Sequence, residues 1–258
     1  MAIMAVVHRP LPLPFSMSAC AIHYQNVHKQ LAGMNVLRGV DLCILPGELF
    51  GLVGVNGAGK TTLLKCLFDF CTPDAGSIAI FGQSHRHSAA RAPLSFLPER
   101  FQAPYYLSGR DFLRYLLSLH KVGYDERAAQ AAAAALDLAP DALRRPARDY
   151  SKGMMQKLGL AACLLSGKQQ LVLDEPMSGL DPKARALFKQ ALRQLRAQGR
   201  GAFLTSHALA DVDELCDRMA ILHAGRMVFT GTPEQCRQRH GGTPGASLEQ
   251  AFLNCIAA

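Results

Sequence analysis

One glycine-rich stretch has the residue types and spacing suited to binding a phosphate chain. Residues 54–62 read Gly-Val-Asn-Gly-Ala-Gly-Lys-Thr-Thr, which fits the pattern G-x-x-x-x-G-K-[ST]. Glycine has no Cβ and accepts positive φ, so the backbone can wrap closely around phosphates with its N–H groups pointing inward. The Lys60 ammonium would contact the β- and γ-phosphates, and the Thr61 hydroxyl would be a Mg²⁺ ligand. The candidate phosphate-binding residues are Gly54, Asn56, Gly57, Gly59, Lys60, Thr61 and Thr62.

The flanks of this stretch agree with a phosphate site. Residues 48–53 form an apolar run that predicts a buried strand, and residues 62–68 predict a helix packed on that strand. A helix that starts at the glycine-rich turn directs its free N–H groups toward the same anion. The alternative is a chance glycine-rich turn, and the strand-turn-helix order argues against it.

A pair of carboxylates forms the second half of the predicted site. Asp174 and Glu175 directly follow the apolar run 171–173, which reads as a buried parallel strand. Such strands deliver residues to the sheet edge where ligands bind. Asp174 would hold Mg²⁺ through a water, and Glu175 would orient and deprotonate the water that attacks the γ-phosphate. The alternative is an Asp-Glu pair that only ends a strand.

Two further positions become informative beside these motifs. Ser151 and Gly153 open an apolar helix over residues 155–165, and a serine with free N–H groups at a helix start binds anions well. An ordinary helix N-cap is the alternative. His207 follows a short predicted strand, residues 201–206. A lone histidine is usually only a satisfied polar group, but this one comes after the strand that follows the carboxylate strand.

The motifs and their order resemble the ATP-binding-cassette ATPases, the motor subunits of ABC transporters. The resemblance covers roughly residues 19–235. Residues 150–154 stand at the position of the family signature, residues 178–181 match the D-loop, and His207 stands at the switch histidine. The resemblance implies an α/β fold: a P-loop NTPase core with a mostly parallel sheet, an antiparallel β subdomain and an inserted helical subdomain.

The resemblance also implies a mechanism with ATP and Mg²⁺ as cofactors. In this family two cassettes stack head to tail, and ATP lies between the glycine loop of one and the signature of the other. Ser151 and Gly153 would then act on the γ-phosphate bound by the opposite subunit, and Asp181 would couple the two sites. The implied catalytic residues are Lys60, Glu175 and His207.

The chain departs from the family pattern at three places. Glu99 stands where the family Q-loop usually has glutamine, and we expect it to be a Mg²⁺ ligand with Thr61 and Asp174. The signature reads Ser-Lys-Gly-Met, with Lys152 in place of a glycine. The slot for an adenine-stacking aromatic falls at Leu31, while Tyr24 and His28 are out of register. Because a stacking ring is missing, we expect loose base selectivity, with GTP competing.

Composition limits the possible partners and the cellular compartment of the chain. No run of about 18 apolar residues could span a bilayer. The net charge of +8 includes basic clusters at 144–148 and 237–240, which suit an anionic membrane face. The sequence has no stretch in which basic and aromatic residues alternate, so we do not expect nucleic acid as a partner. Eight cysteines are scattered without a C-x-x-C pair. Cys43 and Cys163 lie in apolar runs, so we expect buried, reduced thiols and a reducing cytoplasm.

The organisation of domains follows from these segments. Residues 1–18 form an N-terminal extension broken by prolines; Met17 is the favoured initiator, and a flexible arm is the alternative. Residues 19–235 form the cassette, with the helical subdomain at about 100–165. Residues 236–258 form a linker and a short helix from Ser247.

These observations favour the ATPase subunit of a bacterial ABC transporter, similar to exporter-type cassettes with Leu-Pro-Glu and Ser-Lys-Gly-Met. We expect a homodimer that drives a separate integral membrane permease from the cytoplasmic face of the inner membrane. One alternative is a nucleotide-switch regulator that hydrolyses little ATP. A P-loop kinase is disfavoured by the D-loop and the signature. The cargo and the direction of transport do not follow from these residues.

Overall fold

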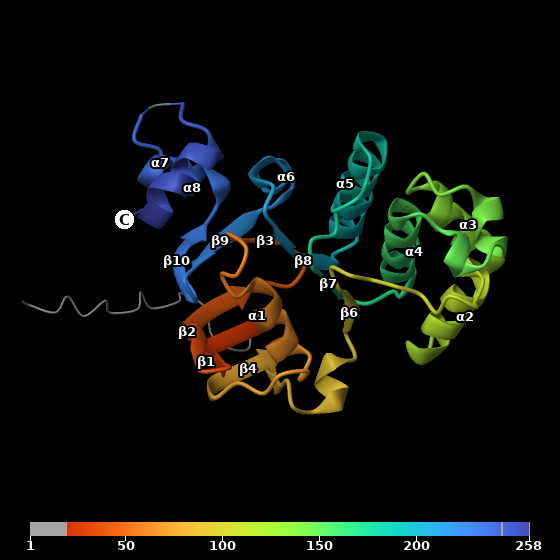
Figure 1. Cartoon of the computed structure of the whole chain (residues 1–258), viewed down its shortest axis with the longest axis horizontal. Coiled ribbons are helices and arrows are strands. Elements are labelled where there is room, and N and C mark those ends of the chain that lie inside the picture. The colour runs from red at the N-terminus through yellow and green to blue at the C-terminus, as the bar shows by residue number, and fades with distance from the viewer. Residues whose placement is uncertain (1–19, 244, 258) are drawn as a thin grey trace, which may run out of the picture.

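The computed structural model describes residues 20–243 and 245–257. They form two β-sheets, one group of helices packed around these sheets and a second group of helices at one end (Figure 1). The expected extension, residues 1–18, lies outside the described residues.

The larger sheet is mostly parallel, as predicted. Its strand order is β10-β9-β3-β8-β7-β6. Every neighbouring pair from β9 to β6 is parallel, and β10 alone is antiparallel. Its strands are β3 (Leu49–Val53), β6 (Leu94–Leu97), β7 (Gln170–Leu173), β8 (Gly201–Ser206), β9 (Arg218–His223) and β10 (Arg226–Gly231). Every residue of β3, β7 and β8 is buried, which explains why these segments read as near-continuous apolar runs.

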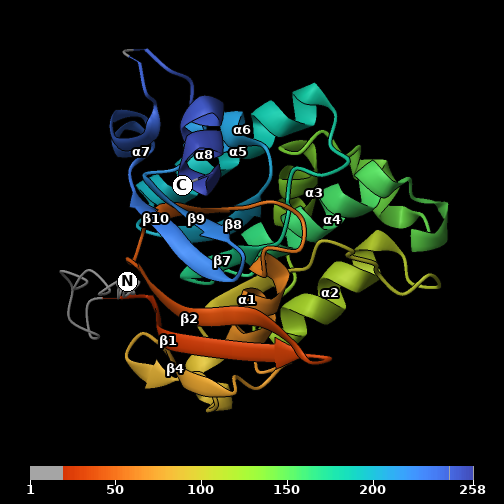
Figure 2. The same ribbon diagram turned by 60° about the vertical axis from the view of Figure 1, so that its left-hand side comes forward.

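The smaller sheet is antiparallel and has the order β2-β1-β4-β5. Its strands are β1 (Ile22–Leu31), β2 (Met34–Ile44), β4 (Ala75–Ile80) and β5 (Gln83–Ser84). Figure 2 shows this sheet below the parallel one, with α1 (Lys60–Leu67) beside it. Leu63, Leu64 and Leu67 of α1 join one buried cluster with side chains of both sheets. This packing fixes where α1 begins, and so where the glycine loop lies.

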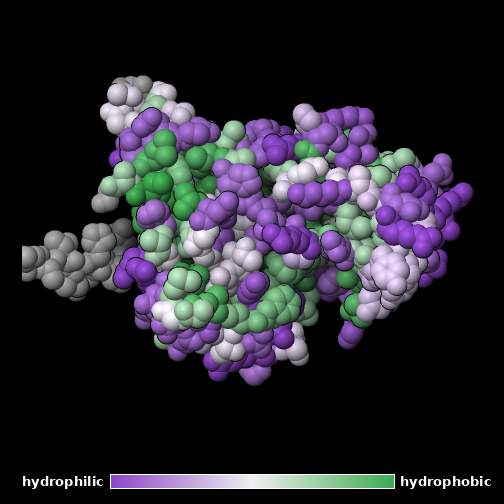
Figure 3. Space-filling view, viewed as in Figure 1, coloured by the Kyte–Doolittle hydropathy of each residue, from purple (hydrophilic) through white to green (hydrophobic). Residues whose placement is uncertain are grey.

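The opposite face of the parallel sheet is covered by helices that follow β7 in the chain, together with one side of the helix over residues 152–165 (Figure 1). The helices that follow β7 are α5 (Pro182–Ala197), α6 (Leu209–Leu215), α7 (Pro233–His240) and α8 (Leu248–Ala257). The boundary expected between residues 235 and 236 falls inside α7, which starts with a capping box of Thr232 and Gln235. Figure 3 shows a hydrophobic area over α8, where Leu253 is 54% exposed.

The second group of helices has its own small core. It contains α2 (Gly109–Leu119), α3 (Glu126–Ala134) and α4 (Lys152–Leu165), with short 3-10 turns η3 (Pro140–Arg144) and η4 (Ala147–Asp149). Another 3-10 turn, η2 (Ser88–Arg91), precedes β6. Each of the three helices begins at a side-chain cap, Ser108, Asp125 or Ser151. The alanine-rich residues 126–138 predict one continuous helix. Instead α3 ends at Ala134, since the chain turns at Asp137, which has a positive φ of 58°.

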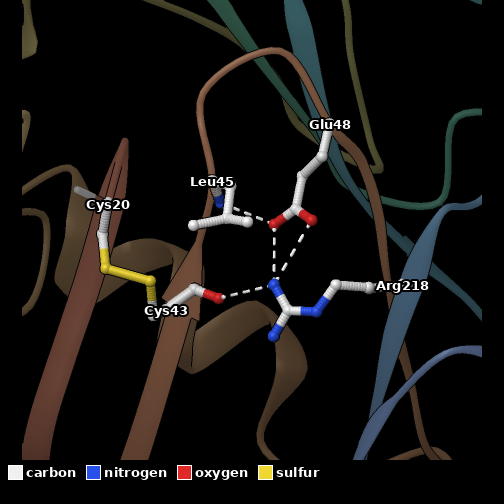
Figure 4. The surroundings of a disulfide bond; sticks show 5 residues. All are labelled: Cys20, Cys43, Leu45, Glu48 and Arg218. Carbon is white, nitrogen blue, oxygen red and sulfur yellow. Dashed lines mark hydrogen bonds and ion pairs between the residues drawn. A yellow bond between two sulfur atoms is a disulfide. The ribbon is translucent and has the colours of Figure 1, made fainter. Parts of the chain in front are cut away.

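The expectation of a reduced Cys43 is wrong in this structure. Cys43 is joined to Cys20 by a disulfide between β2 and a residue two positions before β1 (Figure 4). The paired strands bring the two Cα atoms to 5.6 Å, within bonding range. Beside it, the Arg218 guanidinium donates to the Cys43 carbonyl at 3.4 Å and to Glu48 at 3.2 Å. Burial of Glu48 raises the pKa of its carboxyl, although these bonds oppose the shift.

The other cysteines of the described residues are free thiols. Cys163 is buried, as expected, and burial raises the pKa of its thiol to about 11. Within residues 20–243 and 245–257 no helix combines the length and the apolar character that crossing a membrane requires.

Candidate functional site

The predicted phosphate residues and carboxylates meet in one pocket of about 520 Å³. It lies at the carboxyl ends of β3, β7 and β8, because parallel strands deliver their C-terminal residues to the same edge of the sheet. The pocket is lined by Val36, Val55, Asn56, Gly57, Ala58, Gly59, Lys60, Thr61, Thr62, Glu99, Asp174, Glu175, Ser178 and His207.

The glycine loop has a backbone that other residues would strain. Gly57 has a φ of 82° and Gly59, the residue before α1, a φ of 112°. A Cβ at Gly54 would lie 2.4 Å from the carbonyl oxygen of Leu222, closer than atoms can approach. The loop therefore presses against β9 on one side and opens toward the pocket on the other.

Lys60 is the first residue of α1, and its side chain is held inside the loop. Its ammonium donates to the carbonyl of Gly54 at 2.6 Å and to that of Val55 at 3.4 Å. The ammonium also lies 3.8 Å from Oε1 of Glu175. A buried cation that bonds to loop carbonyls on one side and faces a carboxylate on the other is already positioned where a phosphate chain would be wrapped.

A chain of hydrogen bonds links the loop to both carboxylates. The Thr61 hydroxyl donates to Oδ2 of Asp174 at 3.0 Å. Oδ1 of Asp174 accepts from the Thr205 hydroxyl at 2.6 Å, and the same hydroxyl accepts from the backbone N–H of Glu175 at 2.9 Å. Thr205 was not predicted as a site residue. The signal was present in the Thr-Ser-His sequence at the end of β8, but strand neighbours could not be known from the sequence.

Glu175 is aimed into the pocket by an unusual backbone conformation. Its φ is 49°, a left-handed value that is uncommon for a residue with a side chain. Its Oε2 atom lies 2.8 Å from Nδ1 of His207, which follows the neighbouring strand β8. The structure thus brings Lys60, Glu175 and His207 together.

The residues present fit a magnesium ion. Mg²⁺ is usually held in proteins by one or two carboxylates together with waters and substrate phosphates, so a full protein cage is not needed. The Thr61 hydroxyl and Asp174 are in direct contact, and Glu99 lines the same pocket. In the part of the chain that the structure describes, no group of three or more histidine, cysteine, aspartate and glutamate side chains forms a metal cluster.

Glu99 also borders a second pocket, of about 540 Å³, between the end of β6 and the start of α4. Ser151 and Lys152 line this second pocket. The hydroxyl of Ser151 accepts from the N–H of Met154 at 3.2 Å, so Ser151 caps α4. Exposed Tyr105 lies on the same pocket beside Tyr106.

Ser178, the first residue of the D-loop, lines the first pocket, but the signature residues and the last D-loop residue do not. Ser151, Gly153 and Asp181 are absent from its lining. Asp181 caps α5 instead, accepting from the N–H of Ala184 at 2.9 Å. Within a single chain, therefore, the two groups of predicted site residues remain apart.

The region expected to meet a nucleobase has aliphatic side chains. Leu31 ends β1 and is 41% exposed, and Val36 lines the pocket. Tyr24 is buried, and its hydroxyl donates to the carbonyl of Leu63 at 3.4 Å, so its ring belongs to the core. His28 pairs with the side chain of Asn26.

Comparison with known proteins agrees with this geometry. The family model described as ABC transporter matches residues 37–178. An uncharacterized ABC transporter ATP-binding protein of Synechocystis is 38% identical over 76% of this chain and 56% of its own length. The daunorubicin resistance ATP-binding protein DrrA3 of Streptomyces coeruleorubidus is 36% identical over 88% of this chain and 72% of its own length. The Nod factor export ATP-binding protein I of Burkholderia orbicola is 36% identical over 84% of this chain and 72% of its own length.

The fold comparison gives the same family. A solved ATP-binding subunit of an ABC transporter has a TM-score of 0.80 and 28% identity, covering 91% of this chain and 99% of that one. A bacterial Atm1-family ABC exporter with ATP bound shares the fold. Its TM-score is 0.77 and its identity 22%, over 90% of this chain and 41% of that one. The chain spans 56% and 60% of the length of two cyanobacterial relatives. Since the family model covers more than half of the chain, and the daunorubicin and Nod factor relatives match over most of their own lengths, the chain belongs to the ABC transporter family.

Proposed function

We propose that the chain is the ATP-binding and ATP-hydrolysing motor subunit of a bacterial ABC transporter. One observation carries this proposal: the carboxylate of Glu175 lies between the Lys60 ammonium, at 3.8 Å, and the His207 ring, at 2.8 Å, beside a glycine loop. A base, a cation and a phosphate cradle in one pocket are the parts that hydrolysis of a triphosphate requires.

The glycine loop would bind the triphosphate. Its N–H groups and the start of α1 would surround the β-phosphate, and Lys60 would turn from the loop carbonyls to the phosphate oxygens. A bound Mg²⁺, held by Thr61, Asp174 and Glu99, would neutralise the charge that develops on the β- and γ-phosphates. Thr205 would keep the Asp174 carboxylate oriented, since it bonds the oxygen that Thr61 does not use.

Glu175 would orient a water and accept its proton while the oxygen bonds to the γ-phosphorus. The bond to the β-phosphate oxygen breaks in line, which gives ADP and inorganic phosphate. His207 would fix the carboxylate and contact the γ-phosphate. General-base catalysis of this kind contributes about 10²–10⁴-fold to the rate.

A second copy of the chain would complete the site. Ser151 and Gly153 lie outside the pocket of their own chain, which fits a head-to-tail dimer where they act on the partner's nucleotide. Asp181 would couple the two sites. We take residues 19–235 as the cassette, with 100–165 as its helical subdomain, and residues 236–258 as a C-terminal segment that packs on the core of the cassette.

An integral membrane permease at the cytoplasmic face of the inner membrane is the proposed partner, with export as the direction. The names of the daunorubicin resistance and Nod factor export relatives support export. The exposed tyrosines 105 and 106, which bury little of their rings in this chain, suit contact with such a partner.

Phosphate release by the purified chain tests the proposal. Wild type should hydrolyse ATP about 10²-fold or more faster than Glu175→Gln, since the amide cannot accept the proton. Glu175→Gln should still bind ATP and form a nucleotide-dependent dimer. Glu249→Gln, an exposed carboxylate on α8, is the matched control and should leave the rate unchanged. A wild type no faster than Glu175→Gln would instead support a nucleotide-switch regulator.

A further inference from the structure

One buried lysine joins the signature helix to the D-loop. Lys157 lies in the second turn of α4, and its side chain is 9% exposed. Its ammonium donates to Oδ2 of Asp181 at 3.2 Å, to the carbonyl of Asp137 at 3.0 Å and to Oδ2 of Asp137 at 3.4 Å. An ammonium has three protons, so these acceptors use its full donor capacity.

The two residues that accept these bonds, Asp181 and Asp137, belong to different segments of the chain. Asp181 is the last residue of the D-loop and the cap of α5. Asp137 follows α3 with a positive φ of 58°, a conformation that turns its carbonyl toward Lys157. The lysine itself lies on the helix that begins at Ser151, about 9 Å along the axis at 1.5 Å per residue. One side chain therefore ties the α3–α4 segment, the signature helix and the D-loop together.

Neighbouring contacts show that this alignment is tight. The buried Gln156 amide donates to the carbonyl of Pro176 at 2.9 Å. A Cβ at Gly153 would lie 3.0 Å from the carbonyl oxygen of Gly179, so the signature glycine also permits close approach of the D-loop. One face of α4 thus packs on residues 176–181. Lys157 is the charged residue of this face, and it contacts Asp181.

We propose that Lys157 is a positioning residue that holds the D-loop in register with the signature Ser151 of the same chain. This inference rests on the proposed function, because register matters when both segments must meet the partner copy together. The ion pair fixes Asp181 before the dimer closes, so closure does not have to order it. Lys157 touches neither the glycine loop nor the pocket lining, so ATP binding by one chain does not depend on it.

Lys183 provides a matched control. It pairs with Oδ1 of the same Asp137 at 2.6 Å, but its side chain is 71% exposed and makes no hydrogen bond to Asp181 among the described residues. Both lysines lower the pKa of the Asp137 carboxyl, with Lys183 as the larger cause. Removing Lys183 therefore costs an exposed ion pair without releasing the D-loop.

The test compares Lys157→Met, Lys157→Arg and Lys183→Met in the full chain. Lys157→Met should leave the ATP affinity of the monomer within about twofold. It should weaken nucleotide-dependent dimerisation in the Glu175→Gln background, and lower kcat, by about tenfold or more. Lys157→Arg should recover most of both losses, since a guanidinium can reach both carboxylates. Lys183→Met should behave as wild type.

Amide hydrogen exchange provides a readout independent of hydrolysis. Exchange over residues 177–183 should rise in Lys157→Met and stay unchanged in Lys183→Met. If Lys157→Met does not fold, Asp181→Asn removes the same ion pair from its exposed end and takes its place. Unchanged dimerisation and exchange in Lys157→Met, or equal losses in Lys183→Met, would overturn the inference. A wild type that releases no phosphate would refute the proposed function instead, and exchange would still decide the role of Lys157.

Discussion

Nδ1 of His207 lies 2.8 Å from Oε2 of Glu175, although the two residues follow different strands. The parallel pairing of β7 with β8 brings the ends of these strands to one sheet edge. Oε1 of the same carboxylate faces the Lys60 ammonium at 3.8 Å. Glu175 is therefore held from both sides, which fixes the orientation of its carboxylate in the pocket.

Loss of the His207 ring should slow the chemistry and spare binding. We expect His207→Ala to reduce kcat by about 10²-fold, because Glu175 loses one of its two orienting partners. ATP affinity, measured by equilibrium dialysis, should change little. His87→Ala, an exposed histidine before η2, is the control. A His207→Ala variant with normal kcat would rule out a role in positioning Glu175.

Thr205 should control the metal dependence. Thr205→Val removes the hydroxyl that bonds Asp174 and the N–H of Glu175, while the side chain keeps its shape. The concentration of Mg²⁺ that gives half-maximal ATPase should rise about 10–100-fold, as for other outer partners of metal ligands. Thr205→Ser keeps the hydroxyl and should titrate as wild type. Coincident curves for wild type and Thr205→Val would refute this.

Glu99→Gln should also change the Mg²⁺ dependence of the ATPase, because it replaces a proposed ligand of the ion. A carboxylate binds Mg²⁺ more strongly than an amide does, and it also places negative charge near the γ-phosphate. We expect a shift in Mg²⁺ dependence that exceeds any change in ATP affinity. Titrations of wild type and variant over the same Mg²⁺ range decide the point, and equal curves would exclude Glu99 as a ligand.

An aromatic ring at position 31 should add affinity for the nucleobase. Leu31 is 41% exposed at the end of β1, so a tyrosine at this position can extend into solvent without displacing buried side chains. Stacking should increase ATP affinity by about 1 kcal/mol, or roughly fivefold. Inorganic tripolyphosphate, which has no base, should bind wild type and variant equally. Wild type should also bind GTP about as well as ATP, and strong preference for ATP would contradict an aliphatic base site.

The disulfide should contribute to stability under oxidising conditions. Cys43→Ala opens a loop with a sequence separation of 23 residues, which should lower the free energy of unfolding by about 3 kcal/mol on the loop-entropy estimate. Urea titration with and without dithiothreitol measures this. The reductant should affect wild type but not a Cys20→Ala/Cys43→Ala variant. Eight reactive thiols in unfolded, unreduced wild type would show that the bond does not form.

Much of the fold could be read from periodicity and composition. The runs at 48–53, 171–173 and 201–206 predicted buried strands, and all three correspond to strands of the parallel sheet, β3, β7 and β8. The helical pattern between residues 101 and 165 gave α2, α3 and α4. The end of α3 was misplaced because helix propensity does not report the backbone turn at Asp137. The disulfide was missed because nothing local in the sequence indicates that Cys20 lies beside Cys43.

Short stretches of sequence were enough to predict the phosphate-binding loop and the carboxylate pair. The glycine spacing, Lys60 and the Asp174-Glu175 pair are local patterns, and their meaning depends on residue type and on the element that follows. Only the tertiary structure decided which of these groups touch. Thr205, Lys157 and the His207–Glu175 contact depend on strand neighbours and helix packing, which join residues distant in the chain. Contacts of that kind are set by burial of the whole core, and no short segment of sequence encodes them.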